Sequence, residues 1–244
     1  MPTKPKKNQP ETPNDVQGKD LFQTPKYAVD LLIPFIPKNI NRIWECAAGD
    51  LKISNVLLEL GYHIISSDIR NNSEDIMYHN FLLDKPIDIG ETTAIITNPP
   101  YSLKRKFYEK CREYEVPFAL LIPADYSGWI IEAICNDNAE KIIPSRRINY
   151  ITPNLIENIW RGETKEYIEK NTGNKFKNYS DIPEFLVKRY ENIIKKYNSV
   201  EEIPPGMIVK YSKSQFHSLW ITHGFNLGKS EIFLDLTKEM MYNI

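Results

Sequence analysis

The chain has 244 residues, and its 31 Lys and Arg almost cancel its 32 Asp and Glu, which leaves a net charge of −1. This length suits one α/β domain with an insertion or two small domains, and the charge argues against a general polyanion binder without excluding local basic patches. The three cysteines are widely separated, which predicts a reducing, cytoplasmic location. The four histidines lack metal-ligand spacing and the chain has no long apolar run, so neither a metal site nor a membrane partner is expected.

The first residues and the start of the folded part have different compositions. Residues 1–19 are polar and carry almost no apolar side chains, so we predict a disordered tail there. A helix signal follows, in which Thr24 suits the N-cap position and Pro25 the first turn. An amphipathic helix is therefore predicted over residues 27–35.

The next segment has the pattern of a nucleotide-binding strand and loop. Residues 41–50 predict a strand that runs into a turn of small residues, where Ala47 and Gly49 would let the backbone approach a ligand. After a helix, residues 61–68 predict a second strand that ends in Asp68. A carboxylate at such a strand end can bind both hydroxyls of a ribose, and Asp68 follows Gly49 at close to the roughly twenty residues expected.

A short buried strand ends abruptly in a proline-rich turn. Residues 94–97 are apolar or β-branched, which is typical of a central strand covered on both faces. The strand has to end at Pro99 and Pro100, because neither proline has an N–H group for the ladder, and Asn98 is held extended by the proline that follows it. The sequence therefore predicts a rigid turn at a ligand-binding edge, which offers an amide, backbone carbonyls and the ring of Tyr101.

The α/β alternation continues after this turn. A helix is predicted over residues 102–111, with Lys104 and Arg105 on its first turns. Cations there oppose the helix dipole and so point to an anionic partner such as nucleic-acid phosphate, although a solvated helix face explains them equally well. Arg146 and Arg147 follow a predicted strand and are expected on the rim that faces the ligand. The remaining predicted strands cover residues 116–123, 141–145, 213–224 and 232–236.

Residues 154–212 differ from the rest of the chain, because charges of both signs mix with Tyr, Ile and Leu at helical spacing. We predict a mostly helical insertion here. Its basic residues suit a target-recognition module, and its acids suit a structural or dimerising arm equally well. The expected organisation is a tail (1–19), an α/β domain (20–153 plus 213–244) and this insertion.

Several of these motifs resemble those of one enzyme family. Asn98-Pro99-Pro100-Tyr101 resembles the Asn/Asp-Pro-Pro-Tyr/Phe signature of S-adenosylmethionine-dependent amino-methyltransferases, and residues 146–153 are similar to the Arg-Ile-Asn-Phe/Tyr-x-x-Pro element of phage-type adenine-N6 DNA methyltransferases. Residues 45–51 resemble the family's cofactor loop, except that Cys46 replaces a proline and Leu51 the second glycine. The motifs occur in the family's order and cover about residues 20–153 and 213–224.

The resemblance implies a fold and an activity. The fold would be a Rossmann-like methyltransferase sheet with helices on both faces. The activity would be transfer of the methyl group of S-adenosylmethionine to the N6 amine of adenine in DNA, after the base has been flipped out of the duplex. The Asn98 oxygen and the Pro99 carbonyl would grip the amine and favour its tetrahedral form, while Tyr101 stacks on the base, so no strong base is needed.

The resemblance also implies roles for individual residues. The implied catalytic residues are Asn98, Pro99, Pro100 and Tyr101. The implied cofactor-binding residues are Thr24, Pro25, Glu45, Ala47, Gly49, Asp68, Asn80 and Phe81. The residues expected to contact the phosphate backbone are Lys104, Arg105, Arg146 and Arg147.

Other functions remain open at this point. The same chemistry on RNA or on a protein glutamine amide fits the tetrapeptide, because both substrates present a planar amine. A catalytically degenerate nucleic-acid-binding or decoy subunit fits the departures at Cys46 and Leu51. The family suggests the cytoplasm of a prokaryote or of a phage-infected host cell. The sequence leaves the target site and the oligomeric state open.

Overall fold

The computed structural model describes residues 22–70, 73–152, 154–194, 197–199, 202–212 and 216–242. The predicted tail at residues 1–19 lies outside these ranges. Within them, the chain forms an eight-stranded sheet with the order β3-β2-β1-β4-β5-β7-β6-β8. The strands are β1 (Arg42–Glu45), β2 (His63–Asp68), β3 (Met77–Tyr78), β4 (Thr93–Thr97), β5 (Phe118–Pro123), β6 (Glu140–Pro144), β7 (Ser218–His223) and β8 (Glu231–Leu234).

The sheet is mostly parallel, with β7 as the exception. Strands β1, β2, β3, β4 and β5 pair in parallel, and β7 lies antiparallel between β5 and β6, with Leu121 opposite Trp220. Strand β8 adds to β6 in parallel. The order 3-2-1-4-5 is that of a classic doubly wound nucleotide-binding sheet. The structure therefore confirms the expected Rossmann-like α/β fold.

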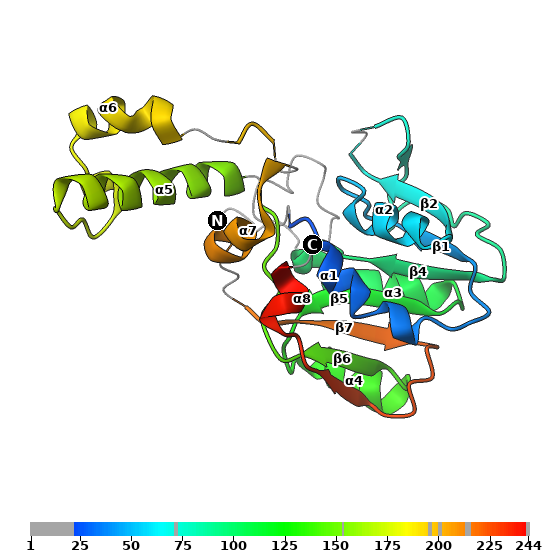
Figure 1. Cartoon of the computed structure of the whole chain (residues 1–244). Helices are drawn as coiled ribbons and strands as arrows, with labels where there is room; N and C mark the ends of the chain where they lie inside the picture. Colours follow the sequence, from blue (N-terminus) through cyan, green and yellow to red (C-terminus); the bar gives the residue numbers. More distant parts are fainter. Residues whose placement is uncertain are drawn as a thin grey trace, which may run out of the picture.

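Helices cover both faces of the sheet (Figure 1). Every residue of β4 is buried, and its successive side chains enter opposite cores: Ile96 packs with α1 (Lys26–Asp30), α2 (Lys52–Glu59) and α8 (Lys238–Tyr242), whereas Ile95 packs with α3 (Lys104–Glu113) and α4 (Gly128–Asn136). This alternation follows from the two-residue period of a strand, so an apolar run at β4 requires cover on both sides.

The first helix differs from the expectation. Helix α1 ends at Asp30, and a 3₁₀ helix, η1 (Ile33–Phe35), replaces the predicted continuation. Pro34 lies in that stretch and cannot donate the hydrogen bond that a longer α-helix needs. The N-cap position is occupied by Pro25, and Thr24 makes no capping bond, so the predicted cap was wrong. Thr24 is buried and lines a pocket instead.

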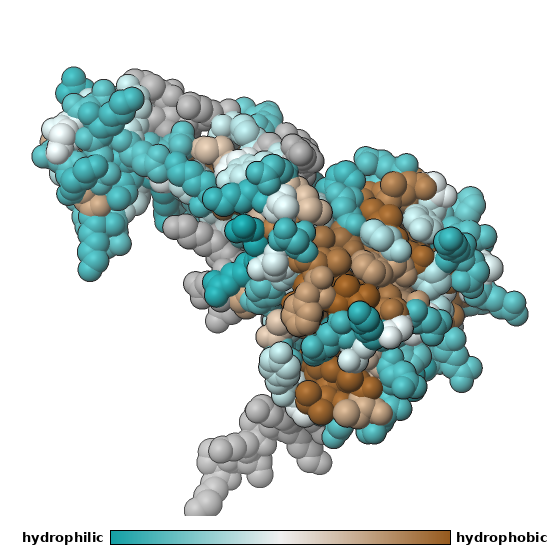
Figure 2. Space-filling model, turned by 60° about the horizontal axis from the view of Figure 1, so that its bottom comes forward, coloured by the Kyte–Doolittle hydropathy of each residue, from teal (hydrophilic) through white to brown (hydrophobic). Residues whose placement is uncertain are grey.

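A helical arm joins β6 to β7. Helices α5 (Leu155–Thr172) and α6 (Glu184–Ile194) extend away from the sheet in Figure 1, with η3 (Tyr179–Asp181) between them and α7 (Pro205–Tyr211) at the base. The far part of the arm has its own small core of Ile168, Ile182 and Leu186. Its surface is largely hydrophilic in Figure 2, whereas apolar residues gather over the sheet. In the part of the chain that the structure describes, no helix has the length and apolarity to cross a membrane.

Candidate functional site

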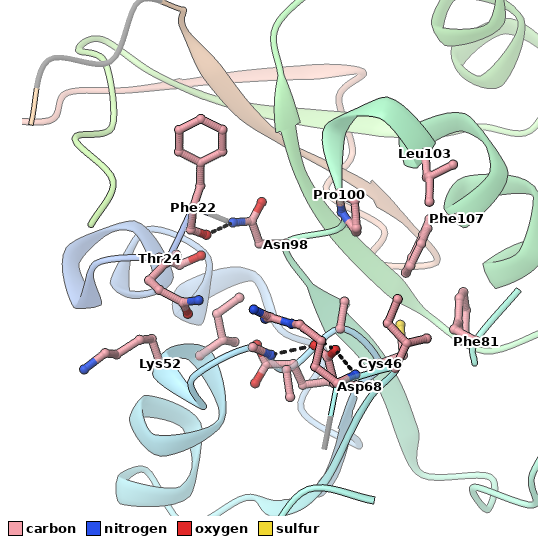
Figure 3. A pocket seen from close by; sticks show the side chains of 18 of the residues that line it. Phe22, Thr24, Cys46, Lys52, Asp68, Phe81, Asn98, Pro100, Leu103 and Phe107 are labelled. Carbon is pink, nitrogen blue, oxygen red and sulfur yellow. Dashed lines mark hydrogen bonds and ion pairs between the residues drawn. The ribbon is translucent and has the colours of Figure 1, made fainter. Parts of the chain in front are cut away.

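A pocket lies where the carboxyl ends of β1, β2 and β4 meet, at the point where the strand order reverses (Figure 3). This is the usual ligand position in an open α/β sheet. Of the eight residues predicted to hold a cofactor, all except Pro25 line this pocket. Asn98 and Pro100 of the proline-rich turn also line it, whereas Pro99 and Tyr101 do not. The predicted cofactor loop and Asn98, one of the two predicted acceptors of the amine, therefore line one cavity.

The turn after β1 depends on Gly49. Its φ angle is +55°, and a Cβ atom there would lie 3.0 Å from Gln23 Nε2 and 3.3 Å from Arg70 Nη2. The Gly49 N–H donates to Asp68 Oδ2 at 2.9 Å, which ties the first loop to the end of β2. A side chain at Gly49 would be strained by the backbone and crowded by two neighbours. The small residue thus keeps the pocket open beside Asp68.

Asp68 is buried at the floor of the pocket and already has partners. Its Oδ1 accepts the Arg70 backbone N–H at 2.8 Å and faces Arg70 Nε at 3.4 Å. Its Oδ2 accepts only the bond from Gly49 among the described residues, and a carboxylate oxygen has two lone pairs. Oδ2 can therefore accept one ribose hydroxyl directly, whereas a second hydroxyl at Oδ1 requires the Arg70 side chain to shift.

Leu51 occupies the position where the family pattern has its second glycine. Its φ angle is +59°, in the left-handed region, and it is the N-cap of α2. The Leu51 N–H donates to the Ala48 carbonyl at 2.8 Å, which closes the loop. The loop therefore has a left-handed backbone at this position despite the leucine. The substitution changes the strain in the loop and leaves its path around the pocket intact.

Glu45 ends β1 and is almost fully buried. Its Oε2 accepts hydrogen bonds from the backbone N–H of Ser54, at 2.8 Å, and from the Ser54 hydroxyl. Burial raises the pKa of Glu45 to about 8, against the two Ser54 bonds, and the nearby Asp68 charge adds to the rise. The raised pKa disfavours the ionised form of this carboxyl, and a cation that binds beside it would favour ionisation.

The Asn98 side chain bonds to Phe22 and interacts with the Tyr101 hydroxyl, while its acceptor oxygen has no partner with hydrogen-bond geometry among the described residues. Its Nδ2 donates to the backbone carbonyl of Phe22 at 2.9 Å. Because a carbonyl can only accept, this bond fixes the orientation of the amide and turns Oδ1 away from Phe22. That Oδ1 is buried and has no hydrogen-bond partner within the described chain. A buried acceptor without a donor is costly, so it marks a place where a ligand N–H group fits.

Tyr101 does not face the pocket, contrary to the simplest expectation for a ring that stacks on a substrate. It begins the short η2 (Tyr101–Leu103). The ring of Phe22 stacks on it, with centroids 5.4 Å apart and planes 20° from parallel. Tyr150 and Phe216 approach the same ring edge-on. A substrate ring can therefore reach the face of Tyr101 that Phe22 covers only after Phe22 moves.

Asn80 and Phe81 both line the pocket, but the Asn80 side-chain oxygen and the Phe81 ring already have contacts within the protein. The Asn80 Oδ1 accepts the backbone N–H groups of Leu82 and Leu83, which fixes the turn after Asn80. Phe81 is 2% exposed, and the rings of Phe107 and Tyr114 both stack on it. We therefore correct the expectation that Phe81 offers a ring face to an adenine; it supports the wall of the pocket.

The four predicted phosphate contacts lie in different surroundings. Lys104 forms a close ion pair with Asp125, and this bond together with Ser127 lowers the pKa of Asp125 against the effect of burial. Lys104 is therefore engaged within the protein. Arg105 pairs with Glu109 on the exposed side of α3, at 2.8 Å. The two arginines after β6, Arg146 and Arg147, are exposed.

The segment before α1 closes one side of the pocket, and sequence reasoning missed most of it. Gln23 forms an isolated antiparallel bridge with Ile151, through N–H···O bonds of 2.9 and 3.0 Å. The Gln23 Oε1 also accepts the Asp50 N–H at 3.2 Å. The resulting strap, residues 22–24, touches the first loop, Asn98 and the segment after β6. The sequence signal for this strap is that Phe22-x-Thr24-Pro25 resembles the entry segment of amino-methyltransferases, in which the residues ahead of the first helix close over the cofactor.

Other lining residues also went unpredicted. Lys52 and Arg70 place two cationic side chains at the pocket, and its apolar wall is completed by Ile53, Ile69, Leu82, Leu103 and Phe107. No group of three or more His, Cys, Asp and Glu residues suited to a metal ion occurs among the residues that the structure describes. The pocket thus combines acids, cations, an unpaired amide oxygen and an apolar wall.

Comparison with known proteins gives a likeness of fold only. No protein-family model and no curated protein sequence matches the chain. Among solved structures, it is similar to a candidate methyltransferase from an antibiotic biosynthesis pathway of Anabaena variabilis ATCC 29413, with a TM-score of 0.45, 12% identity and coverage of 84% of this chain and 99% of that chain. It is also similar to the glycopeptide N-methyltransferase MtfA complexed with S-adenosyl-L-methionine, with a TM-score of 0.38, 10% identity and coverage of 88% and 98%. At these values the function has to be argued from the site itself.

Proposed function

We propose that this protein is an S-adenosylmethionine-dependent methyltransferase that acts on the exocyclic N6 amine of adenine in DNA. The observation that carries the proposal is the buried, unpaired Oδ1 of Asn98, a residue that lines the same pocket as the Gly49–Asp68 loop. An acceptor that receives a planar amine thus lies beside a site with the features of a nucleoside pocket.

The residues of the pocket fit this cofactor part by part. Asp68 Oδ2 is placed for a ribose hydroxyl, and Gly49 leaves room where a Cβ atom would collide with Gln23 and Arg70. Glu45 is a buried carboxyl that gains from ionisation beside the cationic amino group of a methionine moiety. Leu103 and Phe107 provide an apolar wall for a purine. S-adenosylmethionine supplies, when bound, a methyl group activated by its sulfonium centre.

The residues of the proline-rich turn would act on the amine. The Asn98 Oδ1 and the Pro99 carbonyl each accept one N–H bond of the amine, and the Asn98 Oδ1 has no hydrogen-bond partner within the described part of the chain. Two acceptors draw the amine nitrogen toward tetrahedral geometry and stabilise the positive charge that develops on it. The bond from Asn98 Nδ2 to Phe22 holds the amide in place, so this stabilisation needs no rearrangement.

DNA adenine is preferred as the substrate because the tetrapeptide and the Arg-Ile-Asn element resemble those of adenine methyltransferases. The adenine would have to leave the base stack to reach a pocket of this depth. Of the four predicted phosphate contacts, Arg105, Arg146 and Arg147 are exposed, with Arg105 paired to Glu109, whereas Lys104 is half-buried and paired with Asp125. That pairing lowers the number of phosphate contacts and is the observation that favours a protein glutamine amide as the second candidate substrate.

The test is a transfer assay with tritiated S-adenosylmethionine and with DNA, RNA and protein offered in parallel. We expect label in DNA, at N6 of adenine. The Asn98→Ala variant should lose roughly 100-fold or more in rate and keep its cofactor affinity, because it removes a contact that matters most in the transition state.

The matched control is Asn98→Asp, which keeps an acceptor oxygen but loses the donor to the Phe22 carbonyl, and it should retain part of the activity. Full activity in Asn98→Ala would contradict the assigned role of Asn98. Label in protein or RNA alone would replace DNA as the substrate, and no measurable cofactor binding would identify a binding subunit.

A further inference from the structure

The face of Tyr101 is occupied by a residue of the chain itself. Phe22 stacks on it nearly parallel, at 5.4 Å between centroids. Phe216 meets Tyr101 at 87° and Tyr150 meets it at 70°, so both make edge contacts. Phe22 is therefore the only ring within the described residues that covers the Tyr101 face by stacking.

We propose that Phe22 is a placeholder for the substrate: its ring occupies the stacking face of Tyr101 until the planar, amine-bearing ring of the substrate displaces it. This inference rests on the proposed function and identifies a specificity-determining residue for it. Phe22 is a lining residue of the pocket and Tyr101 is not, and the ring of Phe22 stacks on Tyr101.

The spacing of the two rings requires displacement rather than insertion. A ring sandwiched between two others needs planes about 7 Å apart, because stacked carbon atoms approach to roughly 3.5 Å on each side. The centroids of Phe22 and Tyr101 are closer than that even with their offset. A third ring therefore cannot enter while Phe22 stays where it is.

The backbone of Phe22 can remain in place while its ring moves. The carbonyl accepts the bond from Asn98 Nδ2, whereas the ring points away from Asn98 in Figure 3. The bridge of Gln23 with Ile151 anchors the next residue. Rotation about the Cα–Cβ bond of Phe22 shifts only the ring, so the Asn98 amide keeps its orientation as the face of Tyr101 opens.

Displacement of this kind selects for an amine. Any planar ring regains the stacking that Phe22 gives up, but only a ring with an exocyclic NH2 group can give one N–H to the unpaired Asn98 Oδ1 and the other to the Pro99 carbonyl. Thymine has no such group, and its one donor, N3–H, is flanked by two carbonyl oxygens that repel these acceptors. Displacement of the Phe22 ring therefore costs free energy that adenine recovers more fully than thymine does.

The experiment measures how tightly short, dye-labelled oligo(dA) and oligo(dT) strands bind, by fluorescence anisotropy, with S-adenosylhomocysteine present at saturation. Single strands avoid the unknown duplex site, and oligo(dT) reports phosphate contacts. We expect Phe22→Ala to bind oligo(dA) roughly tenfold more tightly than the wild type, because a competing stacking contact is gone. The gain should disappear when Tyr101→Ala is added, since the two residues then no longer compete.

Phe233→Ala is the matched control, because Phe233 is 72% exposed on the edge strand β8 and should leave both affinities unchanged. Phe22→Leu removes the planar face and keeps apolar bulk, so it carries the test if Phe22→Ala does not fold. Unchanged or weaker oligo(dA) binding in Phe22 variants that fold overturns the placeholder role and leaves the proposed function standing. Equal binding of oligo(dA) and oligo(dT) in every variant overturns adenine as the substrate, and the placeholder role with it.

Discussion

At the scale of single residues, the site is built from polar groups whose hydrogen-bonding capacity is only partly used within the protein. Asn98 has its donor bound to Phe22 and its acceptor unpaired, and Asp68 has one oxygen crowded by Arg70 and one with a lone pair to spare. Glu45 is buried and bonded to Ser54, but its environment disfavours its charge. Each of these groups stays incompletely satisfied until a ligand supplies the missing donor or charge.

Glu45 leads to a prediction about pH. Its pKa is raised from 4.5 to about 8 in the folded protein, chiefly by burial, so the folded state holds a proton that the unfolded state has released. The free energy of unfolding should therefore fall by a few kcal/mol as the pH rises from about 4.5 to about 8. The Glu45→Gln variant, neutral at every pH, should lack this part of the decline. Urea unfolding of both proteins across that range measures the difference, and parallel curves would contradict the assignment.

At the scale of elements, the loop between β1 and α2 is where the sequence departs most from the family pattern. Leu51 adopts a left-handed conformation that glycine adopts without strain, and it does so at the start of α2. The Gly49 bond to Asp68 and the Gln23 bond to Asp50 hold the loop from two sides. Tertiary contacts thus impose a backbone conformation that the local sequence disfavours.

This strain predicts that Leu51→Gly stabilises the protein. A left-handed backbone at leucine destabilises the folded state by about 1–2 kcal/mol, and glycine would remove this strain. Glycine also makes the unfolded chain more flexible, which offsets part of the stabilisation. A net increase of roughly 0.5–1 kcal/mol is expected, visible as a higher Tm. Leu51→Ala is the control, because it keeps the Cβ atom and hence the strain. Stabilisation by alanine equal to that by glycine would show that strain at this residue is not the cause.

At the scale of the whole molecule, the arm and the sheet are stabilised by separate cores. The far part of the arm depends on Ile168, Ile182 and Leu186, none of which belongs to the two cores that sandwich the sheet. Its helices are connected to the sheet through the chain at β6 and β7 and through packing near α7. A recognition role for the arm stays a prediction, and so does the division of the chain into domains.

The separation of cores predicts that damage to the arm spares the pocket. Ile168→Asp places a charge at a fully buried position and should disrupt the far part of the arm. Hydrogen exchange should then become fast in α5 and α6 and remain slow in β4, and cofactor affinity should stay unchanged. DNA affinity should fall only if the arm contacts DNA. Loss of cofactor binding would show that arm and pocket are coupled. Ile168→Val, which keeps the apolar packing, is the control.

The sequence by itself determined the sheet and one half of the site. The apolar run at β4, the two prolines after it and the spacing from Gly49 to Asp68 are local patterns, and strand period, proline chemistry and βαβ spacing convert them directly into structure. Of the predicted cofactor residues that line the pocket, Ala47, Gly49 and Asp68 follow from these patterns, because parallel strands bring their carboxyl ends to one edge. The others, Thr24, Glu45, Asn80 and Phe81, were expected from the family resemblance.

Only the tertiary structure decided how the site is closed. The bond from Asn98 to Phe22 and the bridge from Gln23 to Ile151 join segments far apart in the chain, and no local period encodes them. The same holds for the stacking of Phe22 on Tyr101, because the position of Phe22 depends on the bonds that anchor the strap to Asn98 and Ile151. Long-range packing also decided that Lys104 pairs with Asp125 and that Phe81 packs within the core. The sequence alone therefore places Asn98 at the end of a strand, whereas the tertiary structure decides how its side chain is oriented.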